Sequence, residues 1–415
     1  MKSLALAVLL AAVAPLAAGD WPQFLGPNGD GHYAGPKLPT EWGPDKNVAW
    51  RTPIPGKGWS SPVISKGKVF LTTAVPAENG DQSLRAVCVD AAAGKIEWNV
   101  EVLKQPASTA KMHGKNSHAS PTPVTDGETV YVHFGYSGTA ALDFAGKILW
   151  TRGGIYSKPV HGGGGSPIIV GDLLVFSADA TDKQAVVALD RKSGKPAWET
   201  PRGNNAPRPF SFSTPQPYEQ NGKKLILSAG SDVLMALDPA DGAEVWRSKY
   251  TGYSVIPRPI VGNGLVYIST GYDSPVVHAV KLDGSGDVTK TNAAWSVNKV
   301  GPNTPSMLLV GAELYLLADK GLFTCLDAKT GKQAYSERIK GEYSASMLYA
   351  DGKIYATSET GTGTLLAAGR KFDKLGEFEM KEKTFATFAG ADGALYLRTE
   401  TQLFKFANGT TTSSK

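Results

Sequence analysis

The sequence predicts an all-β fold, an eight-bladed β-propeller of four-stranded antiparallel blades, and three observations lead to it. A hairpin motif, Ala-x-Asp-x-x-x-Gly-Lys-x-x-Trp, recurs along the chain, most clearly from Val187 to Trp198. Its closing aromatic residues follow one another at intervals of 40 to 52 residues, the length of one propeller blade. The last repeat holds three strands, and its missing fourth is available at residues 48–51. Strands from both ends of the chain would therefore close the ring and leave no exposed sheet edge.

Each copy of the motif combines an aspartate, a glycine and an aromatic residue whose expected roles are mechanical. The carboxylate should accept N–H groups of the turn, the glycine should adopt the left-handed conformation, and the aromatic ring should pack between adjacent blades. We therefore predict that these residues dock the blades and take no part in chemistry. The predicted docking residues are Trp50, Asp90, Trp98, Asp143, Trp150, Asp190, Trp198, Asp238, Trp246, Trp295 and Asp327.

The chain begins with the features of a secretory signal peptide. Lys2 precedes an apolar run, and the small residues Ala17 and Gly19 lie just before Asp20. We predict cleavage after residue 19 and export to the periplasm or the medium; an uncleaved N-terminal anchor is the alternative. No other stretch approaches the ~18 apolar residues of a membrane span, so none is expected in the mature chain.

The remaining sequence divides into three parts. Residues 20–46 are rich in proline and glycine and predict an extended arm lying on the ring, residues 47–407 predict a single propeller domain, and residues 408–415 form a polar tail. Within the propeller, most units open with a Ser-Pro or Thr-Pro pair, because proline suits the first residue of a strand. The expected blade openings are Ser61, Ser120, Ser166, Thr214, Arg258, Thr304 and Ser344.

Charge and cysteine content exclude several classes of function. The chain carries 43 basic and 38 acidic side chains; loss of Lys2 with the signal peptide would leave a net charge of +4. No basic run of the kind that binds nucleic acid occurs. Cys88 and Cys325 occupy the same motif position in distant blades, beyond disulfide range, so we predict buried thiols. We expect a monomer.

The residues just before each blade opening should converge on the mouth of the central channel, because the chain returns there to begin a new blade. They are rich in Arg, Lys, His and aromatic side chains and contain no carboxylate. Such a set suits a flat or anionic ligand; alternatively, these groups hydrogen-bond neighbouring blades and seal the ring. The candidate ligand-binding residues are Trp59, His113, His118, Lys158, His161, Arg208, Arg258 and Tyr343.

No catalytic residue and no metal site are predicted. His113 and His118 are not spaced to share a helical face, and thiolate or carboxylate partners are lacking. Residues 282–290 partly match a calcium-binding loop, but Val288 replaces the required glycine and Ala294 the closing glutamate, so a solvated hairpin tip is expected.

The repeated motif resembles the docking motif of quinoprotein-type, or PQQ-like, eight-bladed propellers, which include PQQ-dependent alcohol dehydrogenases and the outer-membrane assembly factor BamB. The segments DWPQFLGPNGDG, LPTEW, NVAW and PGKGWSSPVI are also similar to exported PQQ-like repeat proteins of planctomycetes and verrucomicrobia. The chain departs from the dehydrogenases because adjacent cysteines, a recognisable calcium site and a Cys-x-x-Cys-His haem motif are missing from the sequence. It departs from BamB because a lipid-attachment cysteine is missing near residue 20.

The resemblance implies an exported, non-enzymatic binding or protein-assembly scaffold that uses the channel mouth, with an unidentified protein or a small anionic or planar ligand as its partner. The alternative is a PQQ-dependent alcohol or sugar dehydrogenase with a non-standard cofactor site. In that case Trp59 would stack on the quinone, and Lys158, Arg208 and Arg258 would hold its carboxylates. A polysaccharide hydrolase would need paired carboxylates in one cleft, and it ranks last.

Overall fold

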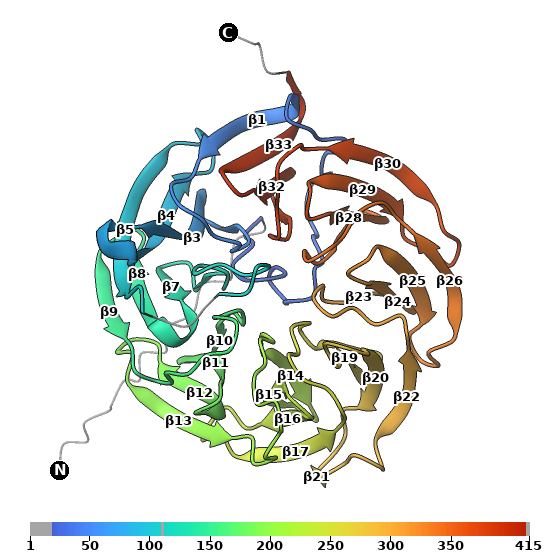
Figure 1. Ribbon diagram of the computed structural model, residues 1–415. Helices are drawn as coiled ribbons and strands as arrows, with labels where there is room; N and C mark the ends of the chain where they lie inside the picture. The colour runs from blue at the N-terminus through green and yellow to red at the C-terminus, as the bar shows by residue number, and fades with distance from the viewer. Residues whose placement is uncertain (1–18, 109–111, 412–415) are drawn as a thin grey trace, which may run out of the picture.

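The computed structural model describes residues 19–108 and 112–411 and shows eight β-sheets arranged as blades around a central channel (Figure 1). This confirms the predicted eight-bladed propeller. Residues 1–18 of the predicted signal peptide and residues 412–415 of the predicted tail lie outside the described residues. Within the described ranges, no helix is both long and apolar enough to cross a membrane.

The first four blades contain four consecutive antiparallel strands each, counted from the channel outward. Blade 1 consists of β2 (Val63–Ser65), β3 (Lys68–Pro76), β4 (Gln82–Asp90) and β5 (Ile96–Gln105). Blade 2 consists of β6 (Val124–Thr125), β7 (Thr129–His133), β8 (Thr139–Asp143) and β9 (Ile148–Arg152). Blade 3 consists of β10 (Ile168–Val170), β11 (Leu173–Asp179), β12 (Gln184–Asp190) and β13 (Pro196–Pro201). Blade 4 consists of β14 (Gln216–Gln220), β15 (Lys223–Gly230), β16 (Val233–Leu237) and β17 (Glu244–Lys249).

The other four blades repeat this order, and the last of them combines strands from both ends of the chain. Blade 5 consists of β18 (Ile260–Gly262), β19 (Leu265–Ser269), β20 (Val276–Lys281) and β22 (Ala293–Asn298). Blade 6 consists of β23 (Leu308–Val310), β24 (Glu313–Leu317), β25 (Leu322–Asp327) and β26 (Gln333–Arg338). Blade 7 consists of β27 (Leu348–Ala350), β28 (Lys353–Thr357), β29 (Thr362–Ala367) and β30 (Lys374–Glu379). Blade 8 consists of β31 (Ala389–Ala391), β32 (Ala394–Arg398), β33 (Gln402–Thr411) and β1 (Lys46–Pro53).

The ring is closed by strands from opposite ends of the chain, as predicted. β1 pairs antiparallel with β33, with Trp50 opposite Lys405 and Pro53 opposite Gln402. The pairing continues to Lys46 opposite Thr411. Residues 408–411, assigned to a polar tail from the sequence, are therefore part of the closing strand, because the partners of β1 extend that far.

The motif tryptophans join each blade to the next. Five indole Nε1 groups, those of Trp50, Trp98, Trp150, Trp198 and Trp295, donate to a backbone carbonyl in the following blade's hairpin at 2.9–3.1 Å. The motif aspartates accept N–H groups within their own turns, as Asp190 does from Ser193 at 2.8 Å. The hairpin glycine lies against the preceding blade's indole, so the motif connects two blades through residues that are distant in the chain.

Blade 4 departs from this scheme because its outer edge receives a fifth strand. β21 (Gly286–Asp287) pairs in parallel with β17, and Lys249 forms an ion pair with Asp287 at 2.8 Å. Trp246 is fully buried beneath this addition and donates to Tyr218 Oη in its own blade at 2.8 Å. Residues 282–290, expected as a solvated hairpin tip, therefore partly extend a neighbouring sheet.

The N-terminal arm crosses the base of the channel (Figure 1). Trp21 exchanges two backbone hydrogen bonds with Ile64 of blade 1, at 2.8 and 2.9 Å. Tyr33 donates its backbone N–H to Tyr349 of blade 7 and accepts from Gly393 of blade 8 through its hydroxyl. Between these ends, Phe24 lines the channel cavity and accepts a hydrogen bond from Arg258. The arm therefore makes the channel blind at one end.

The apolar core lies between the blades, where alternate residues of the middle strands interlock. Cys88 and Cys325 are fully buried in two of these layers and form no disulfide, which confirms the predicted buried thiols.

His133 in blade 2 makes stability depend on pH. The residue is 2% exposed, its ring packs at a tilt against Phe176 with the ring centroids 4.4 Å apart, and it shares a hydrogen bond with Thr139 Oγ1 at 2.8 Å. Burial lowers the pKa of His133 from its ordinary value of 6.5 to about 3. The folded-state pKa is below the unfolded value, so the unfolded chain binds the extra proton as pH falls.

We expect neutral His133 to make its full contribution to stability above pH 6.5. Between pH 6.5 and 3 this contribution should be lost, and the free energy of unfolding should fall by up to about 1.4 kcal/mol per pH unit. His133→Leu should therefore reduce the fall in unfolding free energy between about pH 7 and about pH 4.5, measured by urea titration. Equal falls in the two proteins would contradict this assignment.

Candidate functional site

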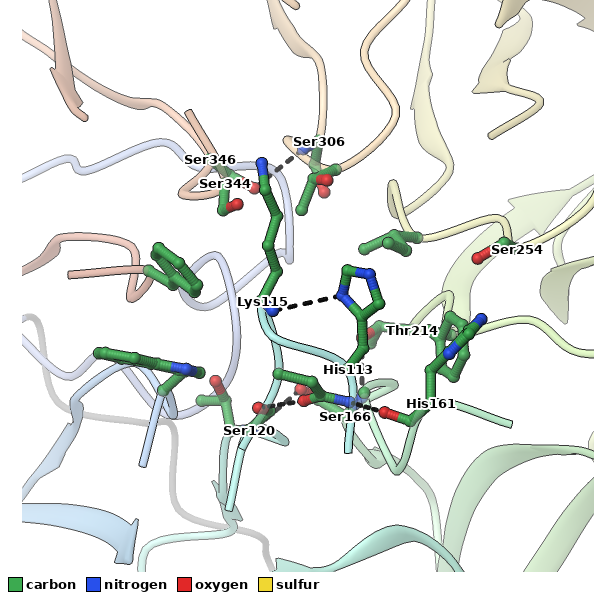
Figure 2. Close-up of a pocket in the computed structure, with 18 of the residues that line it drawn as sticks. His113, Lys115, Ser120, His161, Ser166, Thr214, Ser254, Ser306, Ser344 and Ser346 are labelled. Atoms are coloured by element: carbon green, nitrogen blue, oxygen red, sulfur yellow. Dashed lines mark hydrogen bonds between the residues drawn. The ribbon is translucent and has the colours of Figure 1, made fainter. Parts of the chain in front are cut away.

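The channel contains a well-formed cavity of about 270 Å³, bounded by the arm below and by loops of the surrounding blades (Figure 2). Phe24 forms its floor. The walls include Trp59, Phe210, Phe212 and Phe385. Its open end is the face where the chain enters each innermost strand. This face is hereafter the mouth face.

A ring of hydroxyl groups encircles the cavity just above the floor. In seven blades, the backbone N–H of one residue near the start of the innermost strand donates to the side-chain oxygen of the equivalent residue in the next blade, at 2.9–3.0 Å. Seven of the eight positions are serine or threonine, and the side chains are almost fully buried. We call Ser61, Thr122, Ser166, Thr214, Ser306, Ser346 and Thr387 the hydroxyl ring.

The eighth position of the ring is Arg258, and it turns away from the cavity. Its backbone N–H still donates to Ser306 Oγ, but its guanidinium donates to the carbonyl of Phe24 at 2.7 Å. Gly29 packs so closely that an added Cβ would lie 2.3 Å from the guanidinium carbon. Burial lowers the pKa of Arg258 to about 9. Arg258 therefore anchors the floor.

Two histidines lie side by side on the cavity wall. The rings of His113 and His161 are 5.2 Å apart and edge to face, and His161 makes a similar contact with Phe210 at 5.4 Å. Asn116 holds the two loops together by donating to the carbonyl of His161 at 2.8 Å. Figure 2 shows His113 and His161 next to each other. Partial burial, followed by the proximity of His113, holds the pKa of His161 below its ordinary value. His161 is therefore mainly uncharged at neutral pH.

Ion pairs tie the mouth-face loops to one another. Lys115, in the loop between blades 1 and 2, reaches across to Glu359 of blade 7 at 2.7 Å, and Ser344 donates to the same carboxylate at 2.7 Å. In Figure 2 the side chain of Lys115 extends toward Ser344. Asp273 of blade 5 accepts from Arg208 at 3.1 Å and from the Tyr253 hydroxyl at 2.6 Å. Lys115 and Arg208 are therefore each paired with a carboxylate of another loop on this face.

The structure brings together only part of the predicted site. Trp59, His113 and His161 line the cavity. Arg208 lies outside it, stacked on Tyr253 with its Cζ 4.1 Å from the ring centroid. His118 also lies apart from the cavity lining and contacts Gln105 Oε1 at 2.9 Å.

Three further candidates do not line the cavity. The side chain of Lys158 is exposed, and its loop is held through the backbone by Asp182. Tyr343 is fully buried and donates to the carbonyl of Lys340 at 2.7 Å. Arg258 is fully buried beneath the arm. Arg258 occupies the same position as the residues of the hydroxyl ring, and its side chain points into the arm because its guanidinium donates to the Phe24 carbonyl.

Sequence reasoning missed two sets of residues. The carboxylates Asp182, Asp273, Asp319 and Glu359 lie on the mouth face, in loops joining the second and third strands of their blades. Those loops lie on the same face as the blade openings, so the sequence could have predicted that their acidic residues lie at the mouth. The hydroxyl ring uses Thr122, Ser306 and Ser346, each two residues beyond the opening expected there. In blade 2 a second Thr-Pro pair, Thr122-Pro123, marked the correct register.

The cavity does not fit PQQ in the manner expected. Of the three cations proposed to hold its carboxylates, Lys158 and Arg208 lie outside the cavity lining and Arg258 is buried against the arm. Lys115, which does line the cavity, is paired with Glu359. Across residues 19–108 and 112–411, no group of three or more His, Cys, Asp or Glu side chains is placed to hold a metal ion.

We therefore expect no micromolar binding of PQQ, with or without Ca²⁺, in a calorimetric titration of the protein. A dissociation constant of about 1 μM or lower, roughly −8 kcal/mol, would overturn this expectation. In that case Arg208→Ala should be titrated next, to show whether the Arg208 guanidinium swings inward to the ligand.

Eight four-stranded blades, docked by the Asp-Gly-Trp hairpin around a channel, define the class of PQQ-like β-propellers. Comparison with known families agrees, because a family model described as outer membrane protein assembly factor BamB matches residues 40–178, 182–316 and 290–373. The chain belongs to this family.

Individual relatives are distant in sequence. Outer membrane protein assembly factor BamB of Moranella endobia (strain PCIT) is 24% identical over 59% of this chain, and that of Burkholderia pseudomallei (strain K96243) is 28% identical over 44%. The chain spans 64% and 40% of the lengths of these two relatives. The crystal structure of BamB from Moraxella catarrhalis superposes with a TM-score of 0.62 at 12% identity, covering 87% of this chain and 97% of the other, which shows a shared fold.

Proposed function

We propose that this chain is an exported, non-enzymatic scaffold for the assembly of outer membrane proteins, and that it binds a protein partner through its mouth face. Family membership and the names of the relatives support the assembly role. The signal-peptide pattern of residues 1–19 supports export to the periplasm or beyond. The protein acts as a monomer until a partner binds.

The observation that carries the proposal is the cross-tied mouth face. Lys115 joins the loop before blade 2 to Glu359 of blade 7 across the channel. Asp319 likewise accepts from the backbone of Asn303 at 2.7 Å and from the Thr304 hydroxyl at 2.7 Å. Loops held in this way lose little conformational freedom on association, which favours partner binding.

Deletion of the gene in its host tests the role directly. We expect lower amounts of folded outer membrane proteins in the envelope fraction, measured by quantitative mass spectrometry, and recovery when the chain is restored. Unchanged amounts would contradict the assembly role. Turnover of an alcohol or sugar by the purified protein would contradict the non-enzymatic assignment.

A matched pair of charge reversals tests which face is used. Arg208, whose side chain is 56% exposed, lies on the mouth face, whereas Lys192, 70% exposed, lies in a hairpin at the opposite end of blade 3. Arg208→Glu should reduce complementation and Lys192→Glu should leave it unchanged. The reverse result would place the partner on the other face.

A further inference from the structure

The hydroxyl ring presents a set of hydrogen-bond donors to the cavity. Each of its seven oxygens accepts one backbone N–H from the preceding blade, and that of Ser306 accepts it from Arg258. Within the described part of the chain, none of the seven ring hydroxyls donates to a protein acceptor. All seven residues line the cavity.

These donors favour a ligand with many oxygen acceptors. A hydroxyl that already accepts a hydrogen bond is polarised and becomes a stronger donor, and a buried donor left without an acceptor is costly. A merely structural ring could satisfy these hydrogens with water. A ligand that replaces this water must supply acceptors in several directions at once.

The arrangement of the donors selects the shape of the ligand. They come from blades 1, 2, 3, 4, 6, 7 and 8 and point inward around almost the whole circumference. A carboxylate or phosphate group would meet only the few hydroxyls on one side. A cyclic polyol carries oxygen atoms around its entire edge and can meet hydroxyls on all sides.

The remaining walls suit the faces of such a ring. Phe24 lies below the hydroxyl ring, and Phe212, Phe385 and Trp59 stand around the cavity above it. Phe385 and Trp59 form one continuous aromatic surface, with centroids 4.7 Å apart. A sugar ring has C–H groups on its faces, and these pack favourably against aromatic carbon.

The electrostatics favour an uncharged ligand. The ammonium of Lys115 is neutralised by Glu359, and the guanidinium of Arg258 is turned into the arm. His161 remains mainly neutral at about pH 7, since its pKa is held below its ordinary value of 6.5. An anion entering the cavity would therefore leave water without gaining an unpaired positive charge.

We propose that the channel cavity binds one uncharged cyclic polyol, a sugar ring, with its edge against the hydroxyl ring and its faces against the aromatic side chains. The volume of about 270 Å³ and the closed floor limit occupancy to a single ring. This ring is either a free monosaccharide or the terminal unit of a glycan entering from the mouth. The site is independent of the proposed assembly role.

Calorimetry and saturation-transfer NMR on the full mature protein test the proposal. The probes are glucose, N-acetylglucosamine, myo-inositol and maltotriose, with the open-chain polyol sorbitol and sodium sulfate as controls. We expect at least one cyclic probe to bind with a dissociation constant of about 1 mM or lower, and both controls to bind more weakly. Preference for maltotriose over glucose would identify a glycan end, and the opposite preference a free sugar. Failure of every cyclic probe, or tighter binding of sulfate, overturns the proposal.

A matched pair of substitutions locates the site. Ser166→Ala removes a ring hydroxyl, whereas Ser177→Ala removes a buried hydroxyl of the same blade that contacts Ser228 and lies outside the cavity lining. Ser166→Ala should weaken binding about fivefold, and Ser177→Ala should leave it unchanged. If Ser166→Ala fails to fold, Phe385→Leu serves as the second variant, with a similar expected loss. Equal affinities in all folded variants would overturn the assignment.

Loss of sugar binding and loss of the assembly role are distinguishable. A protein that fails to bind every probe but restores outer membrane proteins in the deletion strain contradicts only the sugar site. A protein that binds sugar while deletion has no effect on outer membrane proteins contradicts only the assembly role.

Discussion

Gly194→Ala is expected to lower the free energy of unfolding by about 3 kcal/mol or more, the combined cost of a strained backbone and an overpacked contact. Gly194 lies in the hairpin of blade 3 at φ +67°, and an added Cβ would lie 2.5 Å from the indole of Trp150 in blade 2. Trp150 donates to Arg191 of the same hairpin at 2.9 Å. Displacing the indole would therefore also break the hydrogen bond between the blades.

Gly171→Ala is the matched control. Gly171 also belongs to blade 3 and has φ +61°, but no atom lies within 4 Å of the position that an added Cβ would take. Gly171→Ala should lower the free energy of unfolding only by the cost of the strained backbone, about 1–2 kcal/mol. Urea unfolding followed by tryptophan fluorescence measures both. Similar losses in the two variants would show that the contact with Trp150 does not support the docking of blades 2 and 3.

Arg202→Ala is expected to lower the free energy of unfolding by about 3–5 kcal/mol, because it leaves a buried carboxylate without its partner. Arg202 donates to both oxygens of Asp179 at 2.7 Å, and the two side chains are 1% exposed. It also donates to Ser228 Oγ of blade 4 at 3.1 Å. The pair thus joins blade 3 to blade 4.

Two comparisons separate the buried charge from other effects of the substitution. Arg208→Ala removes an exposed arginine that pairs with Asp273, and it should change stability little because water screens such pairs. The double variant Arg202→Met with Asp179→Leu removes both charges and should be much more stable than Arg202→Ala. If the double variant is as unstable as Arg202→Ala, the instability comes from losing the attraction between Arg202 and Asp179, and not from leaving the Asp179 carboxylate buried without a partner.

Most of the fold could be predicted because its information is local and repeated. The motif from Val187 to Trp198 specifies a strand, a turn and a docking aromatic within twelve residues. Its spacing defines the blades, and the short last repeat required a strand from the N-terminus, which β1 supplies. The departure at Trp246 was not visible, because the strand that covers it, β21, comes from the hairpin of the next blade.

The candidate site was harder to predict because it depends on the direction of each side chain. Trp59, His113 and His161 line the cavity, but Arg258 has a similar position in the sequence and points into the arm. No feature of the neighbouring sequence distinguishes Arg258 from the residues that line the cavity. The contact between Arg258 and Phe24 joins residues that are 234 positions apart.

The sequence by itself determined the architecture: the number of blades, the closure of the ring and the residues that dock one blade to the next. These features follow from hydrophobic alternation and turn chemistry, which act over a few residues and are repeated in each blade. Only the tertiary structure decided the character of the channel. Closing the ring brought seven hydroxyls from seven blades into one circle, placed Phe24 beneath them and paired Lys115 with Glu359. These contacts depend on the curvature of the whole ring, which no single repeat encodes.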